Sequence, residues 1–365
     1  MLPTAVLMTG AHHKGRGATI NPEGRFERLR REAVDDGWGS PPAAEERPPS
    51  PRTQVRPDAS RTVIARNDSP DVPFDRSINP YRGCEHGCTY CYARPSHAYL
   101  GLSPGLDFET KLFAKHDAPV LLRRELARPG YVCAPITLGG NTDAYQPVER
   151  RLRITRRVLE VLAEHRHPVV IVTKSALVLR DLDLLRDMAA EGLARVAVSV
   201  TSLDAELARK LEPRAAAPHR RLAVLRELSR AGVPTAVMVA PVIPGLTDHE
   251  IEQILAAAAG AGAERAGYVL LRLPHEVEDL MTAWLEAHYP SRAARVLSLV
   301  RECRGGRLND PNFGSRMVGQ GAVADMIRRR FDLARRRYGF GHRSFALRTD
   351  LFRPPVPERG QLRLL

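Results

Sequence analysis

The strongest constraint on the fold is a series of short apolar runs, rich in β-branched residues and separated by stretches with helical spacing. Apolar runs of roughly 4 to 8 residues are typical of buried strands, and apolar residues three or four positions apart are typical of helices that cover a sheet. This alternation predicts an α/β chain whose parallel sheet is buried on both faces. The runs lie at 131–140, 168–175, 195–202, 234–243 and 267–274.

Turn signals agree with this pattern. Gly192 and Gly232 stand where helices should end, and the capping box "TDHE" precedes "IEQILAAAAG". A further short strand in "RSINPYRG" gives six strand–helix units. Because a closed barrel of this kind needs eight units, the sequence predicts either an open, partial (β/α)6 TIM-like barrel or a doubly wound sheet. We favour the partial barrel.

The flanking regions differ in composition from this core. Residues 41–58 are dense in proline and charge, which predicts an extended linker, and the preceding "GRFERLRREAVDDGWG" predicts a short helix. We expect an N-terminal extension with its linker at 1–70, the α/β core at 71–275 and a helical, arginine-rich region at 276–365.

The charge balance makes nucleic acid a candidate partner. The formal net charge is +13, and only five of the 55 basic residues are lysines. Clustered arginines bind phosphate backbones, although a GC-rich genome also produces an arginine-rich chain. Six arginines gather in "MIRRRFDLARRRYGF", which indicates either a solvated helix face or a face that binds nucleic acid or an acidic protein.

Five unevenly spaced cysteines do not form a set of paired disulfides, which predicts a reducing, cytoplasmic location. No window reaches the roughly 18 apolar residues of a membrane span, so we expect no membrane partner and no export signal. Nothing in the first seven residues is typical of a structured element, so Met8 is an alternative start to Met1.

Three cysteines with the spacing C-x3-C-x2-C predict a metal-binding loop. They are Cys84, Cys88 and Cys91. A structural zinc site needs four ligands, usually in two pairs; no second pair exists, although His86 or His97 could complete the set. A four-iron cluster with three thiolate ligands instead leaves one iron open for another ligand.

The string Cys84-x3-Cys88-x-Tyr90-Cys91, with an aromatic residue before the third cysteine and a strand before the loop, resembles the radical S-adenosylmethionine (radical SAM) superfamily. The resemblance implies that the three thiolates hold a 4Fe-4S cluster, that the open iron binds SAM, and that Tyr90 packs beside the cluster and adenine. It also implies reductive cleavage of SAM to a 5′-deoxyadenosyl radical, which abstracts hydrogen from a substrate, and a reduced flavodoxin or ferredoxin-type electron donor.

Further motifs follow the order of this superfamily. In "LGGNTD", Gly139 and Gly140 match the stretch that holds the SAM amino group, Asn141 replaces its acidic residue, and Thr142 or Asp143 are substitutes for that acid. A plain glycine turn after a strand is the alternative explanation.

The later motifs imply the rest of the SAM site. Ser199 and Thr201 follow the fourth strand, where the superfamily contacts the ribose, although helix caps use the same residues. Glu212 and Arg214 resemble a charged pair that contacts SAM or its carboxylate, and a solvated surface pair is the alternative. Ile243, in "VAPVIPG", matches a segment that contacts adenine.

"NPYRGCEHGCTYCYAR", "TKS" and "EPR" most resemble the branch related to spore photoproduct lyase, which repairs a thymine dimer in DNA. Gly140 occupies the place of that lyase's hydrogen-returning cysteine. The candidate catalytic residues are therefore Cys133, which is otherwise a buried core thiol, Tyr145 as a radical quencher, and Lys174 at the end of the third strand.

Three hypotheses stay open at this point. The first is a radical SAM enzyme acting on nucleic acid or a nucleotide, with a DNA-repair, photolyase-like role. The second is a radical SAM enzyme that modifies a protein or small metabolite. The third is a non-catalytic zinc-binding α/β module, which would be colourless and hold about one zinc.

Overall fold

The computed structural model describes residues 15–27, 51–341 and 346–355, and within them a seven-stranded sheet forms the centre of the molecule. The sheet order is β10-β9-β8-β7-β6-β3-β2. All neighbours from β3 to β10 are parallel, and only β2 runs antiparallel to β3. The strands are β2 (Ile64–Arg66), β3 (Arg76–Ile78), β6 (Ile136–Leu138), β7 (Val169–Thr173), β8 (Ala194–Ser199), β9 (Thr235–Val242) and β10 (Arg265–Leu270). The predicted mixed α/β fold with a parallel sheet is confirmed.

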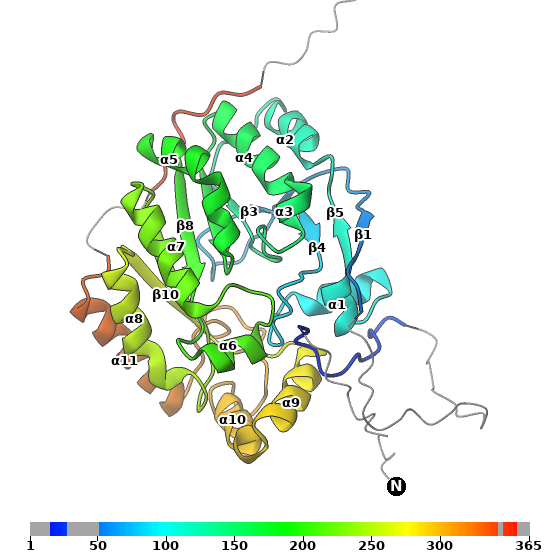
Figure 1. Cartoon of the computed structure of the whole chain (residues 1–365), viewed down its shortest axis with the longest axis vertical. Helices are drawn as coiled ribbons and strands as arrows, with labels where there is room; N and C mark the ends of the chain where they lie inside the picture. Colours follow the sequence, from blue (N-terminus) through cyan, green and yellow to red (C-terminus); the bar gives the residue numbers. More distant parts are fainter. Residues whose placement is uncertain (1–14, 28–50, 342–345, 356–365) are drawn as a thin grey trace, which may run out of the picture.

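Helices connect successive parallel strands and cover the outer face of the sheet (Figure 1). This arrangement follows from the parallel order, because each chain must cross back over the sheet between two strands. The longer covering helices are α4 (Ile154–Glu164), α5 (Leu182–Ala190), α7 (Pro218–Arg230) and α8 (Ile251–Gly260). Shorter elements between them are α3 (Glu149–Leu152), η2 (Ala176–Asp181), α6 (Ala205–Leu211) and η3 (Asp248–Glu250).

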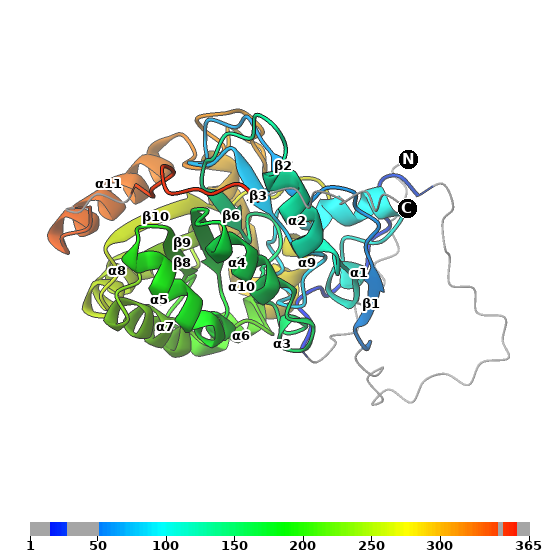
Figure 2. The same cartoon turned by 90° about the horizontal axis from the view of Figure 1, so that it is seen from above.

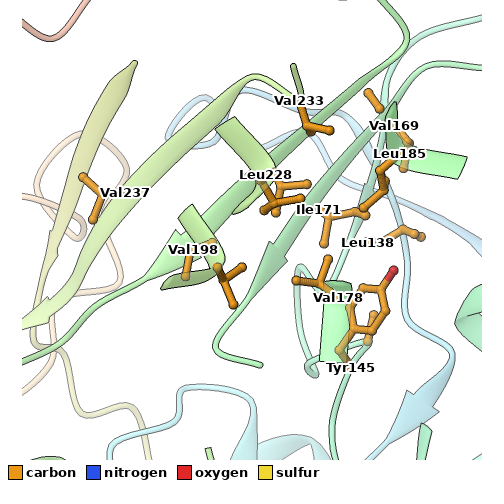
Figure 3. Close-up of a cluster of buried hydrophobic side chains, with 14 of the residues drawn as sticks. Leu138, Tyr145, Val169, Ile171, Val178, Leu185, Val198, Leu228, Val233 and Val237 are labelled. Carbon is orange, nitrogen blue, oxygen red and sulfur yellow. The ribbon is translucent and has the colours of Figure 1, made fainter. Parts of the chain in front are cut away.

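The main core lies between the sheet and these helices (Figure 3). Ile171, Val198 and Val237 of three neighbouring strands belong to one cluster with Leu185 of α5 and Leu228 of α7, and all five side chains are fully buried. Burial of each such side chain contributes roughly 1.5 to 3 kcal/mol. Since strand residues alternate between faces, the intervening residues point to the opposite face of the sheet, where the candidate site lies.

The N-terminal region is more integrated than the sequence predicts. Within the expected linker at 41–58, Gln54–Pro57 form strand β1, which pairs in parallel with β5 (Lys111–Ala114). The linker prediction is wrong there, because the main chain of β1 completes the hydrogen bonding of β5; residues 41–50 lie outside the described part. Most of the short helix expected before the linker also lies outside it. The other elements of this end are β4 (Tyr81–Arg82), η1 (Arg94–Leu100), α1 (Leu106–Thr110) and α2 (Ala118–Leu126).

The described part of the C-terminal region is largely helical. It contains α9 (Val277–His288), α10 (Pro290–Glu302) and α11 (Ala322–Arg337). Helix α11 packs against α8, at the end of the molecule opposite β1 and α1 (Figure 2). Arg330 of α11 forms an ion pair with Glu252 of α8 at 2.7 Å, so the arginine-rich helix is not wholly a solvated face. Among the described residues, none of the helices has the length and apolar character needed to cross a bilayer.

Candidate active site

The three cysteines of the predicted metal-binding loop lie between β4 and η1. Gly83 and Gly87 adopt positive φ values of 77° and 68°, a conformation that glycine tolerates best, and they turn the loop sharply. The loop is braced from two sides. Cys84 donates its main-chain N–H to the carbonyl of Phe108 at 2.9 Å, and the amide of Gln146 bonds the main chain of Glu85 and Gly83.

A large cavity lies on the inner face of the sheet, and the cysteine loop forms part of its wall. Its volume is about 1130 Å³. Inward-facing strand residues that alternate with the core residues form another part, among them Val170, Val172, Ala236 and Met238. Ligand pockets are typically roughly 300 to 1,000 Å³, so this cavity has room for a cofactor and part of a substrate together.

All three cysteines line this cavity. Cys84 and Cys88 are buried and Cys91 is partly exposed. Burial raises the pKa of the Cys84 thiol well above its ordinary value, and Asp143 and the other two cysteines raise it further, since all of these groups lie near one another. Burial likewise raises the pKa of Cys88 to about 12. A thiolate in this loop therefore needs a positive partner. In the described part of the chain, no three His, Cys, Asp or Glu side chains are already gathered around a single-ion position.

Asp143 joins the cysteine loop to the end of β7. Its carboxylate lies 3.3 Å from Nδ1 of His86 and accepts hydrogen bonds from the Thr173 hydroxyl at 2.8 Å and the Lys174 main-chain N–H at 2.7 Å. Burial alone would raise the pKa of Asp143, but His86 and the donated hydrogen bonds lower it to about 2. The carboxylate is thus ionised and already well supplied with donors, and His86 is occupied as its partner.

Glu212 is a second buried carboxylate, beneath Tyr90. It accepts hydrogen bonds from the hydroxyls of Tyr90 and Thr201 and from the guanidinium of Arg221. Burial alone would raise the pKa of Glu212, but Arg221 and Lys174 lower it to about 2. This network fixes the ring of Tyr90, which lines the cavity one residue before Cys91.

Lys174 places a cation on the cavity wall beside the cysteine loop. Its Nζ atom lies 5.9 Å from the centroid of the Tyr90 ring. Burial would lower the pKa of Lys174, but Cys88 and Glu212 raise it above the ordinary value of 10.5. The ammonium group is therefore charged and is available to an anionic group in the cavity.

The structure brings most of the predicted site residues to the cavity and leaves the others away from it. Those that line it are Cys84, Cys88, Cys91, Tyr90, Gly139, Gly140, Asn141, Asp143, Lys174 and Ser199. Those that do not are Thr142, Thr201, Glu212, Arg214, Ile243, Cys133 and Tyr145.

The residues away from the cavity have other partners. Arg214 forms an ion pair with Glu85 at 2.9 Å, whereas Glu212 pairs with Arg221, so the two residues of the predicted charged pair have separate partners. Ile243 is fully buried in an apolar cluster that includes Cys88 and Tyr90 of the loop, and its adenine contact stays a prediction.

Of the remaining four, Thr201 donates its hydroxyl to Glu212, and the other three also lie away from the cavity. Thr142 donates its hydroxyl to the carbonyl of Tyr81 at 2.7 Å, and the buried Tyr145 bonds Asp181 at 3.1 Å. Cys133 precedes β6 at the opposite end of that strand from the cavity's glycines; it is partly exposed, not the buried core thiol that the sequence favours.

Sequence reasoning missed the arginines on the cavity wall, which include Arg272 and Arg316. The guanidinium of Arg272 lies 5.1 Å from the centroid of the Tyr92 ring, and burial lowers its pKa. Arg316 lines the cavity nearby and forms an ion pair with Asp71. The available signal for Arg272 was a lone arginine inside the apolar run 267–274, at the end of a strand.

Comparison with known proteins supports the resemblance of the cysteine loop to the radical SAM superfamily. The model of the radical SAM superfamily matches residues 78–258. An uncharacterized protein of Mycobacterium tuberculosis is 38% identical over 232 residues, which cover 63% of this chain and 68% of that protein. An uncharacterized protein of Methanocaldococcus jannaschii is 28% identical over 173 residues, 47% of this chain and 62% of the relative.

Solved structures of spore photoproduct lyase share the fold. A mutant of that lyase superposes with a TM-score of 0.57 at 16% identity and covers 78% of this chain and 80% of its own. The lyase complexed with dinucleoside spore photoproduct gives a TM-score of 0.54 at 16% identity, covering 78% and 77%.

The family match favours the iron–sulfur interpretation of the three cysteines over the zinc hypothesis, and its cofactors are a 4Fe-4S cluster and SAM. The cysteine loop, the cavity and the sequence match agree. The chain therefore belongs to the radical SAM superfamily.

Proposed function

We propose that Cys84, Cys88 and Cys91 hold a 4Fe-4S cluster at the wall of the cavity and that the chain catalyses a radical SAM reaction on a substrate bound in the same space. The observation that carries this proposal is that three thiols and a charged lysine from a different strand face one cavity of about 1130 Å³.

The donor set fits such a cluster. Iron–sulfur clusters in proteins are held by cysteine thiolates, and the positive charge of iron offsets the high thiol pKa that burial imposes. Lys174 adds a second positive charge next to Cys88. Cluster binding requires the three side chains to turn toward a common point, while the hydrogen bonds to Phe108 and Gln146 keep the loop backbone in place.

SAM would lie between the loop and the strand ends. When bound, the reduced cluster supplies the electron that cleaves SAM to the 5′-deoxyadenosyl radical. We propose that Lys174 binds the SAM carboxylate, that Gly139, Gly140 and Asn141 border the amino group, and that Tyr90 packs against the adenosyl part. Ser199 is retained as a ribose contact, and Asp143 positions the loop through His86.

Two buried residues act indirectly in this proposal. Glu212 and Thr201 hold the hydroxyl of Tyr90, and so position its ring without touching the cofactor. We also propose that the six parallel strands form a partial barrel and that residues 71–275 are the catalytic unit. The protein is proposed to be cytoplasmic, which the unpaired state of all five cysteines supports.

For the substrate, we propose a nucleic acid or nucleotide. The basic groups of Lys174, Arg272 and Arg316 on the cavity wall support an anionic substrate, and the structural likeness to spore photoproduct lyase points the same way. Cys133 lies outside the cavity, which favours a reaction that does not use a thiol to return hydrogen. A protein or small metabolite is the alternative substrate. The proposed electron donor is a reduced flavodoxin or ferredoxin-type protein.

Anaerobic purification with iron and sulfide analysis tests the cluster. The wild-type protein should be brown, carry about four irons and cleave SAM to 5′-deoxyadenosine under dithionite. Cys84→Ala, Cys88→Ala and Cys91→Ala should each lose colour and SAM cleavage. Cys133→Ala and Cys303→Ala are matched controls that should keep both. A colourless wild-type protein with one zinc, or an intact cluster in a variant of the loop, would refute the assignment.

The substrate class is tested separately by deuterium transfer. Deuterated oligonucleotides, nucleotides and peptides are each incubated with the enzyme, SAM and dithionite, and the 5′-deoxyadenosine is analysed by mass spectrometry. Deuterium from a nucleotide or oligonucleotide supports the proposal, whereas deuterium only from a peptide or a metabolite contradicts it.

A further inference from the structure

Residues 15–20, here called the strap, lie directly against the back of the cysteine loop. The main chains of Gly17 and Gly87 are so close that a Cβ atom built on Gly17 would be 1.7 Å from the Gly87 carbonyl oxygen. The hydroxyl of Thr89 donates to the Gly17 carbonyl at 3.0 Å. The strap is also covered, since four successive residues, from Arg16 to Thr19, are buried.

Glu109 connects the strap to the loop. Its side chain is fully buried, and its two carboxylate oxygens accept the main-chain N–H groups of Gly17 at 3.0 Å and Ala18 at 2.9 Å. The same carboxylate forms an ion pair with the guanidinium of Arg94. Breaking a buried ion pair leaves an uncompensated charge, so separation of Glu109 from Arg94 is energetically costly.

Arg94 carries the connection to the cysteines. It is fully buried and donates hydrogen bonds to the carbonyls of Cys88 at 2.8 Å and Gly87 at 3.1 Å. The path from the strap to Cys88 therefore consists of two charged side chains in direct contact. Because each of their bonds is charge-assisted and shielded from water, the loop has little freedom to move independently of the strap.

A second connection reaches the loop through the segment before β1. Arg16 donates to the carbonyls of Glu109 at 3.0 Å and Pro51 at 2.7 Å. Thr53 then donates to the carboxylate of Glu85, the residue after Cys84, at 2.7 Å. The N-terminal region is thus tied to the cysteine loop at Glu85 as well as at its middle, from Gly87 to Thr89.

We propose that the strap is a working part of the cluster site: Glu109, Arg94, Gly17 and Thr89 are positioning residues that fix the cysteine loop and shield its back from solvent. This inference rests on the proposed function, because the cluster itself is part of that proposal. It gives the N-terminal extension a role that its distance from the cysteines along the chain does not suggest.

The test uses the full-length protein loaded with its cluster. The variants are Glu109→Gln, which keeps the side-chain volume but loses the charge, and Thr89→Val, a milder change that removes only the hydroxyl. Loss of one charge-assisted hydrogen bond should speed cluster loss in air by about tenfold in Glu109→Gln, with a smaller increase in Thr89→Val. The rate is followed by visible absorbance and by iron per chain.

The matched control is Glu125→Gln, which removes another buried carboxylate. Glu125 lies in α2 and accepts the main-chain N–H of Val63 rather than one from the strap. It should lose its cluster at the wild-type rate. The electron paramagnetic resonance signal of the reduced cluster should change in Glu109→Gln and Thr89→Val and stay unchanged in the control.

The outcomes separate the two proposals. If the wild-type protein holds no cluster, the proposed function fails and the strap's role fails with it. If the wild-type protein holds the cluster and Thr89→Val and a folded Glu109→Gln lose it at the wild-type rate with unchanged spectra, only the strap proposal is overturned. Equal loss in Glu125→Gln would also overturn it, since general destabilisation would then explain the effect.

Discussion

Replacement of Glu212 by Gln should destabilise the protein far more than its near-isosteric shape suggests. The Glu212 side chain is fully buried and pairs with Arg221, whose side chain is 2% exposed. Gln can still accept hydrogen bonds from Tyr90 and Thr201, but it leaves the guanidinium charge without a counter-ion. Removal of one partner of a buried ion pair costs about 3 to 5 kcal/mol, and we expect a loss of unfolding free energy in this range.

The assay is urea unfolding of the cluster-free protein at pH 7, followed by circular dichroism. Glu206→Gln is the matched control: it removes a carboxylate paired with Lys210 at 2.7 Å, but that carboxylate is exposed to solvent and should leave the unfolding free energy unchanged within error. A double variant, Glu212→Gln with Arg221→Met, should recover part of the lost stability, because it removes the uncompensated charge as well.

A loss of unfolding free energy of less than about 1 kcal/mol in Glu212→Gln would refute this reasoning, because an ion pair that contributes so little behaves as a solvated surface pair. Failure of the double variant to recover any stability would indicate that Arg221 is held mainly by its bonds to the carbonyls of Ala216 and Ser199.

Three further predictions concern stability elsewhere in the fold. Gly139→Ala should lower the unfolding free energy in urea by about 2 kcal/mol or more, because φ is 83° and the new Cβ would lie 2.3 Å from the Val172 carbonyl oxygen; a neutral result would contradict the close approach. Arg304→Lys should shift the thermal midpoint downward through a loss of roughly 2 to 3 kcal/mol, because the buried guanidinium donates to four main-chain carbonyls and an ammonium cannot reach them all. Burial lowers the pKa of His167 from 6.5 to about 4, so the unfolded state binds the proton more readily and stability should fall by about 3 kcal/mol between pH 7 and pH 4 from this group; His167→Gln should remove that part of the pH dependence, and an unchanged slope would refute it.

Much of the fold could be predicted from local patterns. The runs at 168–175, 195–202 and 234–243 became β7, β8 and β9, because several β-branched residues in a row leave few alternatives to a buried strand. The run at 131–140 was less well predicted: only Ile136–Leu138 form β6, since Pro135 cannot donate a ladder hydrogen bond. The linker prediction failed at Gln54–Pro57 because strand pairing depends on a partner distant in the chain.

The cysteine spacing by itself predicted a metal-binding loop, because three thiols so close in sequence must share one loop, and a loop after a strand lies where α/β proteins bind ligands. The family match then favoured an iron–sulfur cluster over zinc. Only the tertiary structure decided which other residues belong to that site. Arg214 and Ile243 do not line the cavity, while Arg272, Gln146 and the Glu109–Arg94 pair come to the loop or the cavity wall from other elements. The physical reason is that spacing fixes contacts within one loop or helix, whereas contacts between elements depend on the burial and hydrogen bonding of the whole fold.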